Sequence, residues 1–396
     1  MINNVLLIAE GRIATVQLLE STLAHLVAQG EISLSTLLEK DVKSEHFSAG
    51  TLPVLVRTCT QDSVKLAKTL RRHGVPYAFY IDDNFWKMDA STTLGAYYSD
   101  PVVQRRLDFV TRHAHIVIAS TPLLTDFVRQ FNANTVHLDA AHDFTLIPEL
   151  PPLPEHAGQI RFGFAGSAYR GVDVEALEAE IVALLDSDAR LEFEVIGAQV
   201  ALGDHPRIRV WGYLDSYDEY VALQRSREWH FALAPLGDGE AKRYKTDVKY
   251  REYGAQGIPA IYQDAPPYET VRDQHTGLLA GKARSWTDAM SMFIADAELR
   301  ASVRAAARKD VEQRYGADRV APLWLAALRS VPWRALSDTE RAQLLADIDK
   351  GPSRASVIRA RLWALWRFAR VEAAREGVAQ VARRTVRFIW RRVRRR

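Results

Sequence analysis

The chain has 396 residues, a formal charge of +3 and a single cysteine, Cys59. This length exceeds one ordinary hydrophobic core and predicts two domains of roughly 150–200 residues with some chain left over. One cysteine excludes an intrachain disulfide and a multi-cysteine metal site, and no run of ~18 apolar residues predicts a membrane-spanning helix. Because no early apolar run carries a cleavage signature, we expect a cytoplasmic protein.

The first part of the chain alternates predicted strands with predicted helices. Apolar runs at 5–9, 54–57, 77–81 and 115–119 are typical of strands, and an apolar-periodic stretch from about 14 to 29 predicts a helix. Such alternation predicts a parallel sheet covered on both faces. We expect residues 1–150 to form an N-terminal doubly wound domain.

A proline-rich segment separates this array from a second one. Four prolines between 148 and 154, in PELPPLP, disfavour helix and sheet alike and predict a domain boundary. The second array, 155–330, has predicted strands at 161–166, 191–197, 208–212, 230–236, 258–262 and 277–279, followed by helical patterning from 286 to about 328. The fold class is therefore α/β, with two doubly wound domains whose strand ends face one crevice, where open α/β sheets bind ligands.

The stretch from 245 to 279 combines a charged helix face with a buried strand and two turns. Lys245, Lys249 and Glu252 are spaced i, i+4 and i+7, so a helix here would carry two ammonium groups and one carboxylate on one face. Gly257 is expected to end that helix. On periodicity alone, a solvated charged helix is the alternative, in which Glu252 merely pairs with a neighbouring base.

Residues 252–259, EYGAQGIP, resemble the donor-binding motif of retaining GT-B glycosyltransferases of the family 4 type. The resemblance implies a Rossmann-like acceptor domain at 1–150 and a Rossmann-like nucleotide-sugar donor domain at 155–330. It implies that Glu252 binds the donor ribose and that Lys245 and Lys249 neutralise the leaving diphosphate. It also implies a retaining, metal-independent transfer without a cofactor or a covalent nucleophile. The family places another glutamate eight positions earlier, where this chain has Tyr244; the lysine-bearing version resembles a branch associated with bacterial surface polysaccharides.

Further donor-binding residues follow from the same resemblance. The turn after the strand at 161–166 resembles the family's phosphate-facing loop, and the turns after the strands at 208–212 and 258–262 stand where the family holds the nucleobase and the diphosphate. The expected donor-binding residues in these turns are Gly166, Ser167, Arg170, Gly212, Tyr213, Pro267 and Tyr268. An ordinary strand-to-helix turn is the alternative for Gly166, Ser167 and Arg170, because such turns favour glycine and serine.

Two carboxylates end a predicted strand of the first domain. Asp82 and Asp83 follow the run at 77–81 and are expected at the crevice edge. The segment resembles the Y-D-I-D-D motif of a related branch, which implies a catalytic role facing the sugar or the acceptor; a helix cap is the alternative. We expect no metal here, because paired aspartates bind metal in the other, single-domain class of sugar transferases. His113 and His115 are expected to be packing or capping residues.

The C-terminal segment carries most of the positive charge. Residues 352–396 hold fourteen arginines and two glutamates, which leaves residues 1–351 with a formal charge of −9. Two apolar stripes at helical spacing, with tryptophans, predict basic amphipathic helices that lie on an anionic membrane. A disordered or nucleic-acid-binding tail is the alternative. We expect residues 331–351 to be a linker, and the acidic body argues against a nucleic-acid partner.

Together these features predict a hexosyltransferase-type glycosyltransferase, peripheral on the inner face of the cell membrane. Its donor would be a nucleotide diphosphate-sugar and its acceptor lipid-linked or a polysaccharide. Two alternatives remain open: a catalytically inactive GT-B scaffold that binds sugar nucleotide or glycan, and a UDP-sugar epimerase. A soluble substrate needs no membrane anchor, so the basic tail disfavours the epimerase.

Overall fold

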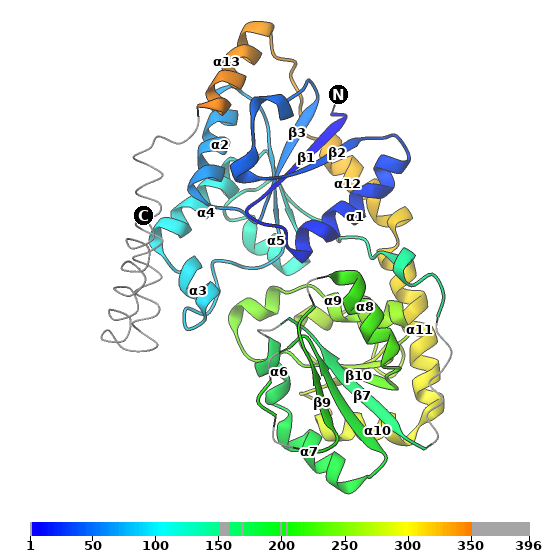
Figure 1. The fold of residues 1–396 in the computed structure, drawn as a ribbon. Helices are drawn as coiled ribbons and strands as arrows, with labels where there is room; N and C mark the ends of the chain where they lie inside the picture. The colour runs from blue at the N-terminus through cyan, green and yellow to red at the C-terminus, as the bar shows by residue number, and fades with distance from the viewer. Residues whose placement is uncertain are drawn as a thin grey trace, which may run out of the picture.

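The chain folds into two α/β halves, one above the other in Figure 1. The computed structural model describes residues 2–150, 158–167, 170–198, 200–202, 205–214 and 216–350. The predicted tail at 352–396 and most of the proline-rich segment lie outside these residues. Each half is built on a six-stranded parallel sheet with flanking helices, which confirms the predicted α/β class.

The N-terminal sheet has the strand order β2-β1-β3-β4-β5-β6. Its strands are β1 (Asn4–Ala9), β2 (Ser33–Leu38), β3 (Thr51–Val56), β4 (Ala78–Ile81), β5 (Ile116–Ala119) and β6 (Thr135–His137). The strands β3, β4 and β5 are buried along their whole length, because helices cover both faces of the sheet. The strand β2 lies on one side of β1, and the strands from β3 onward lie on the other, so the strand order switches between β1 and β3. The loops that diverge at this switch point face the other half.

Helices of the N-terminal half begin where the sequence supplies caps. They are α1 (Ala14–Ala28), α2 (Gln61–Arg72), α3 (Thr93–Tyr98), α4 (Pro101–His113) and α5 (Pro122–Val128), with 3-10 turns η1 (Glu39–Asp41), η2 (Ser44–His46) and η3 (Phe144–Leu146). Thr60, Asp100 and Thr121 accept backbone N–H bonds in the first turns of α2, α4 and α5. The helix α1 starts without a side-chain cap, at the crevice.

The C-terminal sheet has the strand order β12-β11-β10-β7-β8-β9, with its switch point between β7 and β10. Its strands are β7 (Ile160–Ala165), β8 (Leu191–Ile196), β9 (Ile208–Trp211), β10 (Phe231–Ala234), β11 (Ala260–Gln263) and β12 (Leu278–Ala280). The strands β7 and β10 are hydrogen-bonded neighbours at the centre of the sheet, so the loops that leave them converge on the crevice.

Helices of this half are α6 (Gly171–Glu175), α7 (Glu178–Ser187), α8 (Tyr217–Ser226), α9 (Val248–Gln256), α10 (Trp286–Ala295) and α11 (Ala297–Tyr315), with 3-10 turns η5 (Glu240–Tyr244) and η6 (Pro266–Tyr268). Gly257 ends α9 as predicted, with a left-handed φ of 66°. A Cβ at this position would lie 2.4 Å from Leu150 Cδ2, so the site also lacks room for a side chain.

The last described helices return to the N-terminal half, where α1 and α12 lie side by side in Figure 1. The helix α12 (Ala317–Arg329) places Trp324 in the N-terminal core, 5.8 Å from the Tyr80 ring. Beyond it, α13 (Asp338–Asp349) packs against α2, and Asp347 contacts His73 Nε2 at 3.0 Å. Most of the expected linker at 331–351 is therefore a helix that belongs to the N-terminal half, because Leu344 is buried in an apolar cluster of that half.

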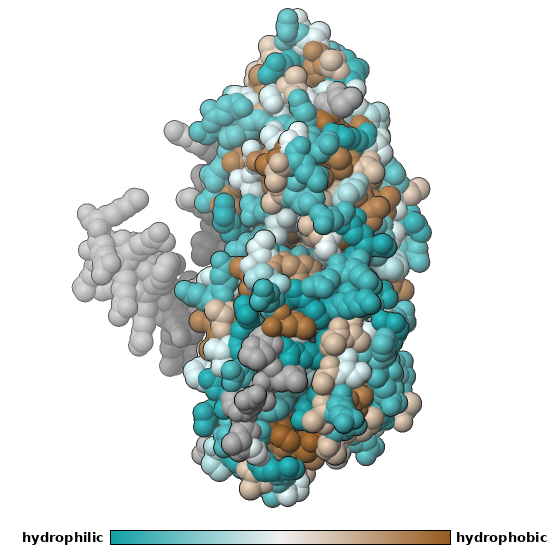
Figure 2. Space-filling view, turned by 90° about the vertical axis from the view of Figure 1, so that its right-hand side faces the viewer, coloured by the Kyte–Doolittle hydropathy of each residue, from teal (hydrophilic) through white to brown (hydrophobic). Residues whose placement is uncertain are grey.

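The surface visible in Figure 2 is mostly hydrophilic, and its apolar residues form small separate groups. Among the described residues, none of the helices is both long enough and apolar enough to cross a bilayer.

Candidate active site

A cavity of about 610 Å³ lies between the two halves, at the carboxyl ends of both sheets. This volume is in the range of ~300–1,000 Å³ that is usual for small-molecule sites. Its walls include the start of α1, the turn after β4, the segment 140–146, and the starts of α8 and α9. Eight predicted site residues line it: Asp82, Asp83, Arg170, Lys245, Lys249, Glu252, Pro267 and Tyr268.

The N-terminal wall is a pair of half-buried carboxylates held by one guanidinium. Asp82 Oδ2 accepts hydrogen bonds from Thr15 Oγ1 at 2.7 Å and from Arg57 Nη1 at 2.9 Å. Arg57 Nη2 lies 3.4 Å from Asp83 Oδ2. The other oxygen of Asp82, Oδ1, is buried and has no hydrogen-bond partner among the described residues. A buried acceptor without a donor is costly, so this oxygen is suited to a ligand hydroxyl.

The two carboxyl groups differ in acidity. Burial raises the pKa of Asp82, and the charge of Asp83 raises it further, although Arg57 opposes the shift. Burial also disfavours ionisation of Asp83, but the nearby Lys245 and Arg57 outweigh it and hold the pKa of Asp83 below its usual value. Asp83 is therefore a fixed negative charge, and Asp82 is the member of the pair that binds a proton more readily.

The C-terminal wall contains a buried ion pair on α9. Lys249 and Glu252 are each only 7% exposed. Lys249 Nζ donates to Glu252 Oε2 at 2.6 Å and to Tyr220 Oη at 3.2 Å, and Tyr220 Oη lies 3.3 Å from the same carboxylate oxygen. None of the hydrogen bonds found within the described part of the chain ends on Glu252 Oε1. Glu252 thus keeps one oxygen for ligand hydroxyls.

Lys245 connects the two walls. Its Nζ donates to Asp83 Oδ1 across the crevice at 2.8 Å. The predicted single helix face is wrong for this residue, because α9 begins only at Val248 and Lys245 is the extended residue that follows η5. Asp247 immediately precedes α9, and both of its carboxylate oxygens accept hydrogen bonds, from Arg251, Thr270 and Tyr315. These bonds fix the chain between the end of η5 and the start of α9.

Among the described residues of the loop after β7, Arg170 lines the cavity. The guanidinium of Arg170 pairs with Asp173 and donates through Nη2 to the carbonyl of Pro235 at 3.0 Å. Gly166 is buried below this loop, and its N–H donates to Ile196 O. Ser167 is exposed and does not line the cavity.

Gly212 and Tyr213 also lie outside the cavity lining. The Tyr213 side chain is 62% exposed and passes close to Gly197, so this loop forms an outer lip of the C-terminal half. The preceding residue, Trp211, is the last residue of β9, and the Arg227 guanidinium lies 4.8 Å from its ring centre.

Tyr244 occupies the position of the family's additional glutamate and does not line the cavity. Its ring packs edge-on against Phe127 of α5, with the ring centroids 5.6 Å apart, and its carbonyl accepts from Thr121 Oγ1 at 3.3 Å. Tyr244 therefore joins the two halves through packing.

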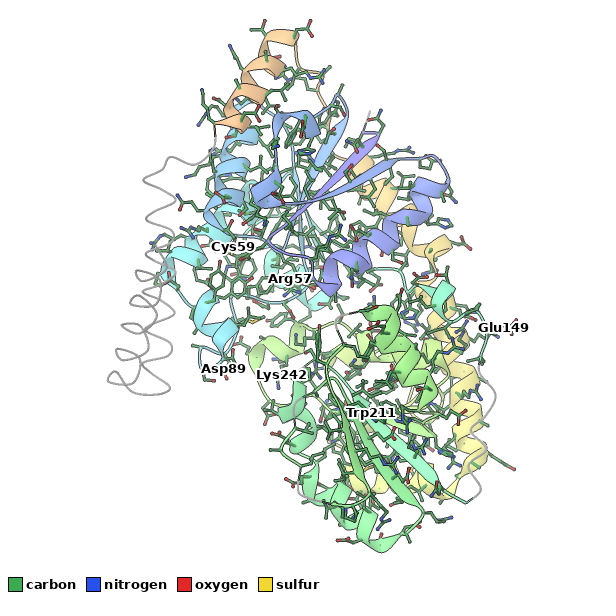
Figure 3. All side chains as sticks on the ribbon, in the orientation of Figure 1. Arg57, Cys59, Asp89, Glu149, Trp211 and Lys242 are labelled. Atoms are coloured by element: carbon green, nitrogen blue, oxygen red, sulfur yellow. The ribbon has the colours of Figure 1, made fainter. Side chains whose placement is uncertain are left out.

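Three further residues at the site were not singled out from the sequence. Arg57 has a φ of 54° and lies where the N-terminal half faces the C-terminal half (Figure 3). Arg251 bonds Asp139, Asp247 and Ala140 O, and its guanidinium lies 4.0 Å from the Tyr315 ring centre. Burial lowers the pKa of His142 to about 4, although Glu252 favours its charged form. A positive φ at arginine has no sequence signal, and the other two depend on partners far along the chain.

Within the described ranges, no group of three or more His, Cys, Asp or Glu side chains could hold a metal ion. Among the described residues that line the cavity, four side chains are cationic, Arg170, Lys245, Lys249 and Arg251, and five are carboxylates.

No protein-family model matches the chain, and no curated protein matches it. Solved structures do match. Anabaena HepE in complex with UDP has a TM-score of 0.59 and 13% identity, over 83% of this chain and 100% of that chain. Sucrose-phosphate synthase from Thermosynechococcus elongatus has a TM-score of 0.60 and 14% identity, over 83% and 98%. A glycosyltransferase from Rickettsia africae ESF-5 has a TM-score of 0.54 and 10% identity, over 83% and 98%. At such identities the likeness shows the architecture, and the chain has the GT-B fold: two Rossmann-like domains that face one crevice.

Proposed function

We propose that the chain is a glycosyltransferase of the hexosyltransferase type, which moves a sugar from a nucleotide diphosphate-sugar to an acceptor hydroxyl. One observation carries the proposal: a single cavity brings Lys249 and Glu252 of one half opposite Asp82 and Asp83 of the other. Structures with the same fold are complexes of HepE with UDP, with UDP and glucose, and with UDP-glucose. A uridine nucleotide is therefore the first donor to test.

On the donor side, we assign the ribose to Glu252 and the diphosphate to cations. Ribose hydroxyls would donate to Glu252, which is an acceptor-only group. The diphosphate would take Lys249 from its 2.6 Å contact with Glu252, and Arg170 would supply a second cation from the loop after β7. Pro267 and Tyr268 would close the cavity beside the diphosphate. Side chains that are already placed stabilise a departing charge without reorganisation of solvent.

For the transfer we propose a retaining, metal-independent reaction without a cofactor. The bond from the anomeric carbon to the phosphate oxygen breaks, and the acceptor oxygen bonds to that carbon on the same face. The departing phosphate oxygen takes the proton of the acceptor hydroxyl. Because the acceptor oxygen attacks the anomeric carbon directly, no protein nucleophile is needed. Lys245 and Lys249 would balance the charge that grows on the diphosphate.

On the acceptor side, Asp82 Oδ1 would accept a hydrogen bond from a hydroxyl of the acceptor or of the transferred sugar, because it is a buried oxygen of the cavity lining that has no donor among the described residues. We propose a lipid-linked or polysaccharide acceptor. The basic tail at 352–396 would hold the protein at the inner face of the cell membrane, next to a lipid-linked substrate.

The test is a panel of nucleotide diphosphate-sugars offered to the purified full chain. A donor at 100 times its Kd should stabilise the fold by about 2.7 kcal/mol, which a thermal-shift assay detects. Release of the nucleoside diphosphate, with transfer to an acceptor extract, then separates an enzyme from a binding scaffold. Conversion of a UDP-sugar to its epimer without an acceptor would identify an epimerase instead. Absence of any stabilisation across the panel would refute the donor site.

A further inference from the structure

A second cavity, of about 370 Å³, lies behind the first one, between β5, β6 and α12 on one side and η5 and η6 on the other. It includes residues of both halves, among them Thr121, His137 and Thr270. Ser120, Lys245, Arg251 and Pro267 line both cavities and form the wall between them. None of the proposed donor contacts other than Lys245 and Pro267 reaches this second cavity.

The charges of the second cavity favour an anion. Its lining has five cationic side chains, Arg243, Lys245, Arg251, Arg314 and Arg319, and three carboxylates, Asp139, Asp247 and Glu269. This excess of positive charge stands in a body, residues 1–351, whose formal charge is −9. A positive pocket on an acidic protein attracts small anions selectively.

Two of the carboxylates are already neutralised. Asp247 Oδ1 accepts from Arg251 Nε at 2.7 Å, and its Oδ2 accepts from Tyr315 Oη at 2.5 Å and from Thr270 Oγ1 at 3.1 Å. Asp139 Oδ1 accepts from Arg251 Nη2 at 2.8 Å. Burial disfavours ionisation of Asp139, but the neighbouring His137 and Arg251 keep its pKa below the usual value. Both groups thus offset Arg251. Lys245 is paired with Asp83 across the crevice, so Arg243, Arg314 and Arg319 remain.

Two of the arginines have no charge partner in the described part of the chain. The side chains of Arg243, after the start of η5, and of Arg319, in the first turn of α12, form no ion pair or hydrogen bond there. Both are exposed at the cavity mouth, and they come from elements that belong to different halves. Arg314 pairs with Asp310 at 2.9 Å, so it adds less. Two guanidinium groups that line one cavity and lack a carboxylate partner among the described residues suit the oxygens of a phosphate group.

We propose that this second cavity binds a phosphate or diphosphate group, with Arg243 and Arg319 as its principal contacts. The group could be a free phosphate compound or the diphosphate of a lipid-linked molecule, since both present the same oxygens to the arginines. A ligand that binds both arginines would join the two halves on the far side of the Lys245–Asp83 contact.

Inorganic pyrophosphate is the probe, titrated calorimetrically into the intact chain at low and moderate salt. Four proteins are compared: wild type, Arg243→Ala/Arg319→Ala, Lys249→Ala, and the control Arg105→Ala/Arg341→Ala. The control removes two exposed arginines remote from both cavities, so it loses the same charge. Every protein keeps the arginine-rich tail, so any binding by the tail is common to all four.

The Arg243→Ala/Arg319→Ala variant should bind pyrophosphate at the second cavity roughly 100-fold more weakly, about tenfold for each lost charge-assisted contact. The control should bind as wild type does, and Lys249→Ala, which alters only the first cavity, should keep the binding that the arginine pair removes. The glutamine pair at 243 and 319 provides a second variant that keeps side-chain bulk. Unchanged binding in both arginine pairs, no binding by wild type, or loss confined to Lys249→Ala would overturn the proposal. These outcomes do not depend on donor binding or turnover, so they stand apart from the test of the glycosyltransferase.

Farnesyl diphosphate, a soluble prenyl diphosphate, distinguishes the two sources. Tighter binding than pyrophosphate, again lost in Arg243→Ala/Arg319→Ala, would support the site and assign it to a lipid-linked diphosphate. Equal affinity for the two probes would support the site as one for a free phosphate compound. Farnesyl diphosphate binding that survives in the arginine pair would contradict the site as drawn.

Discussion

Replacement of Lys249 and Glu252, singly and together, separates the structural role of this ion pair from its proposed role in catalysis. The single variants are Lys249→Met and Glu252→Gln, and the double variant carries both. Each substitution keeps the approximate length of the side chain and removes its charge. The two side chains are buried, and the contact between Nζ and Oε2 is 2.6 Å.

Removal of one member of a buried pair leaves the other charge without compensation, which costs about 3–5 kcal/mol. Lys249→Met leaves Glu252 with Tyr220 as its only described donor. At ~2–4 °C for each kcal/mol, the melting temperature of the Lys249→Met protein should fall by roughly 6–20 °C. The double variant should regain most of this loss, because a neutral pair of similar volume is often as stable as the ion pair.

Activity should not follow stability. Lys249→Met should lower kcat by roughly 100-fold or more, the scale of a deleted electrostatic contact to a developing charge. Glu252→Gln should mainly raise the KM for the donor, because it weakens hydroxyl recognition. The double variant should be stable and still at least ~100-fold less active than wild type. Steady-state kinetics on a confirmed donor, beside thermal denaturation, check this; a stable double variant with near-wild-type kinetics would refute the donor assignment.

Three further predictions concern Arg57, metal dependence and the tail. Arg57→Met should raise the pKa of Asp82 further, so the folded variant binds a proton more tightly than its unfolded chain does. The loss of stability relative to wild type, measured by urea unfolding, should therefore be small near pH 4 and grow as the pH rises toward 8. A deficit that is independent of pH would contradict that role for Arg57. EDTA should leave turnover unchanged, and complete loss restored by Mg²⁺ or Mn²⁺ would count against diphosphate neutralisation by Lys245, Lys249 and Arg170. Deletion of 352–396 should leave a folded protein that no longer sediments with anionic vesicles; equal sedimentation of both forms at moderate salt would exclude the tail as anchor.

Elements with strong local patterns were predictable. Nearly continuous apolar runs identified β1, β3, β4 and β5, because a strand buried on both faces needs apolar residues throughout. β2 and β6 were missed: the first is an edge strand that contains serines and has no fully buried residue, and the second has only three residues. The alternation of the remaining elements was enough to predict two parallel sheets and a crevice at their carboxyl ends.

The site was partly predictable for the same reason. Asp82 and Asp83 follow a buried strand, and Lys249 and Glu252 lie on one helix, so local sequence places each pair at the crevice. Tertiary structure decided the rest. Whether Lys245 joins that helix depends on Asp247, whose carboxylate is held by Thr270 and Tyr315.

Long-range contacts also decided what no local pattern could show. Arg57 neutralises carboxylates that lie 25 and 26 positions further along the chain, and α12 crosses back to cover a core built from the first strands. The second cavity takes its arginines from η5 and α12, which are far apart in sequence. A sequence determines local periodicity and turn chemistry, whereas the partners of a buried charge are determined by packing between distant segments, where desolvation makes each unpaired group costly.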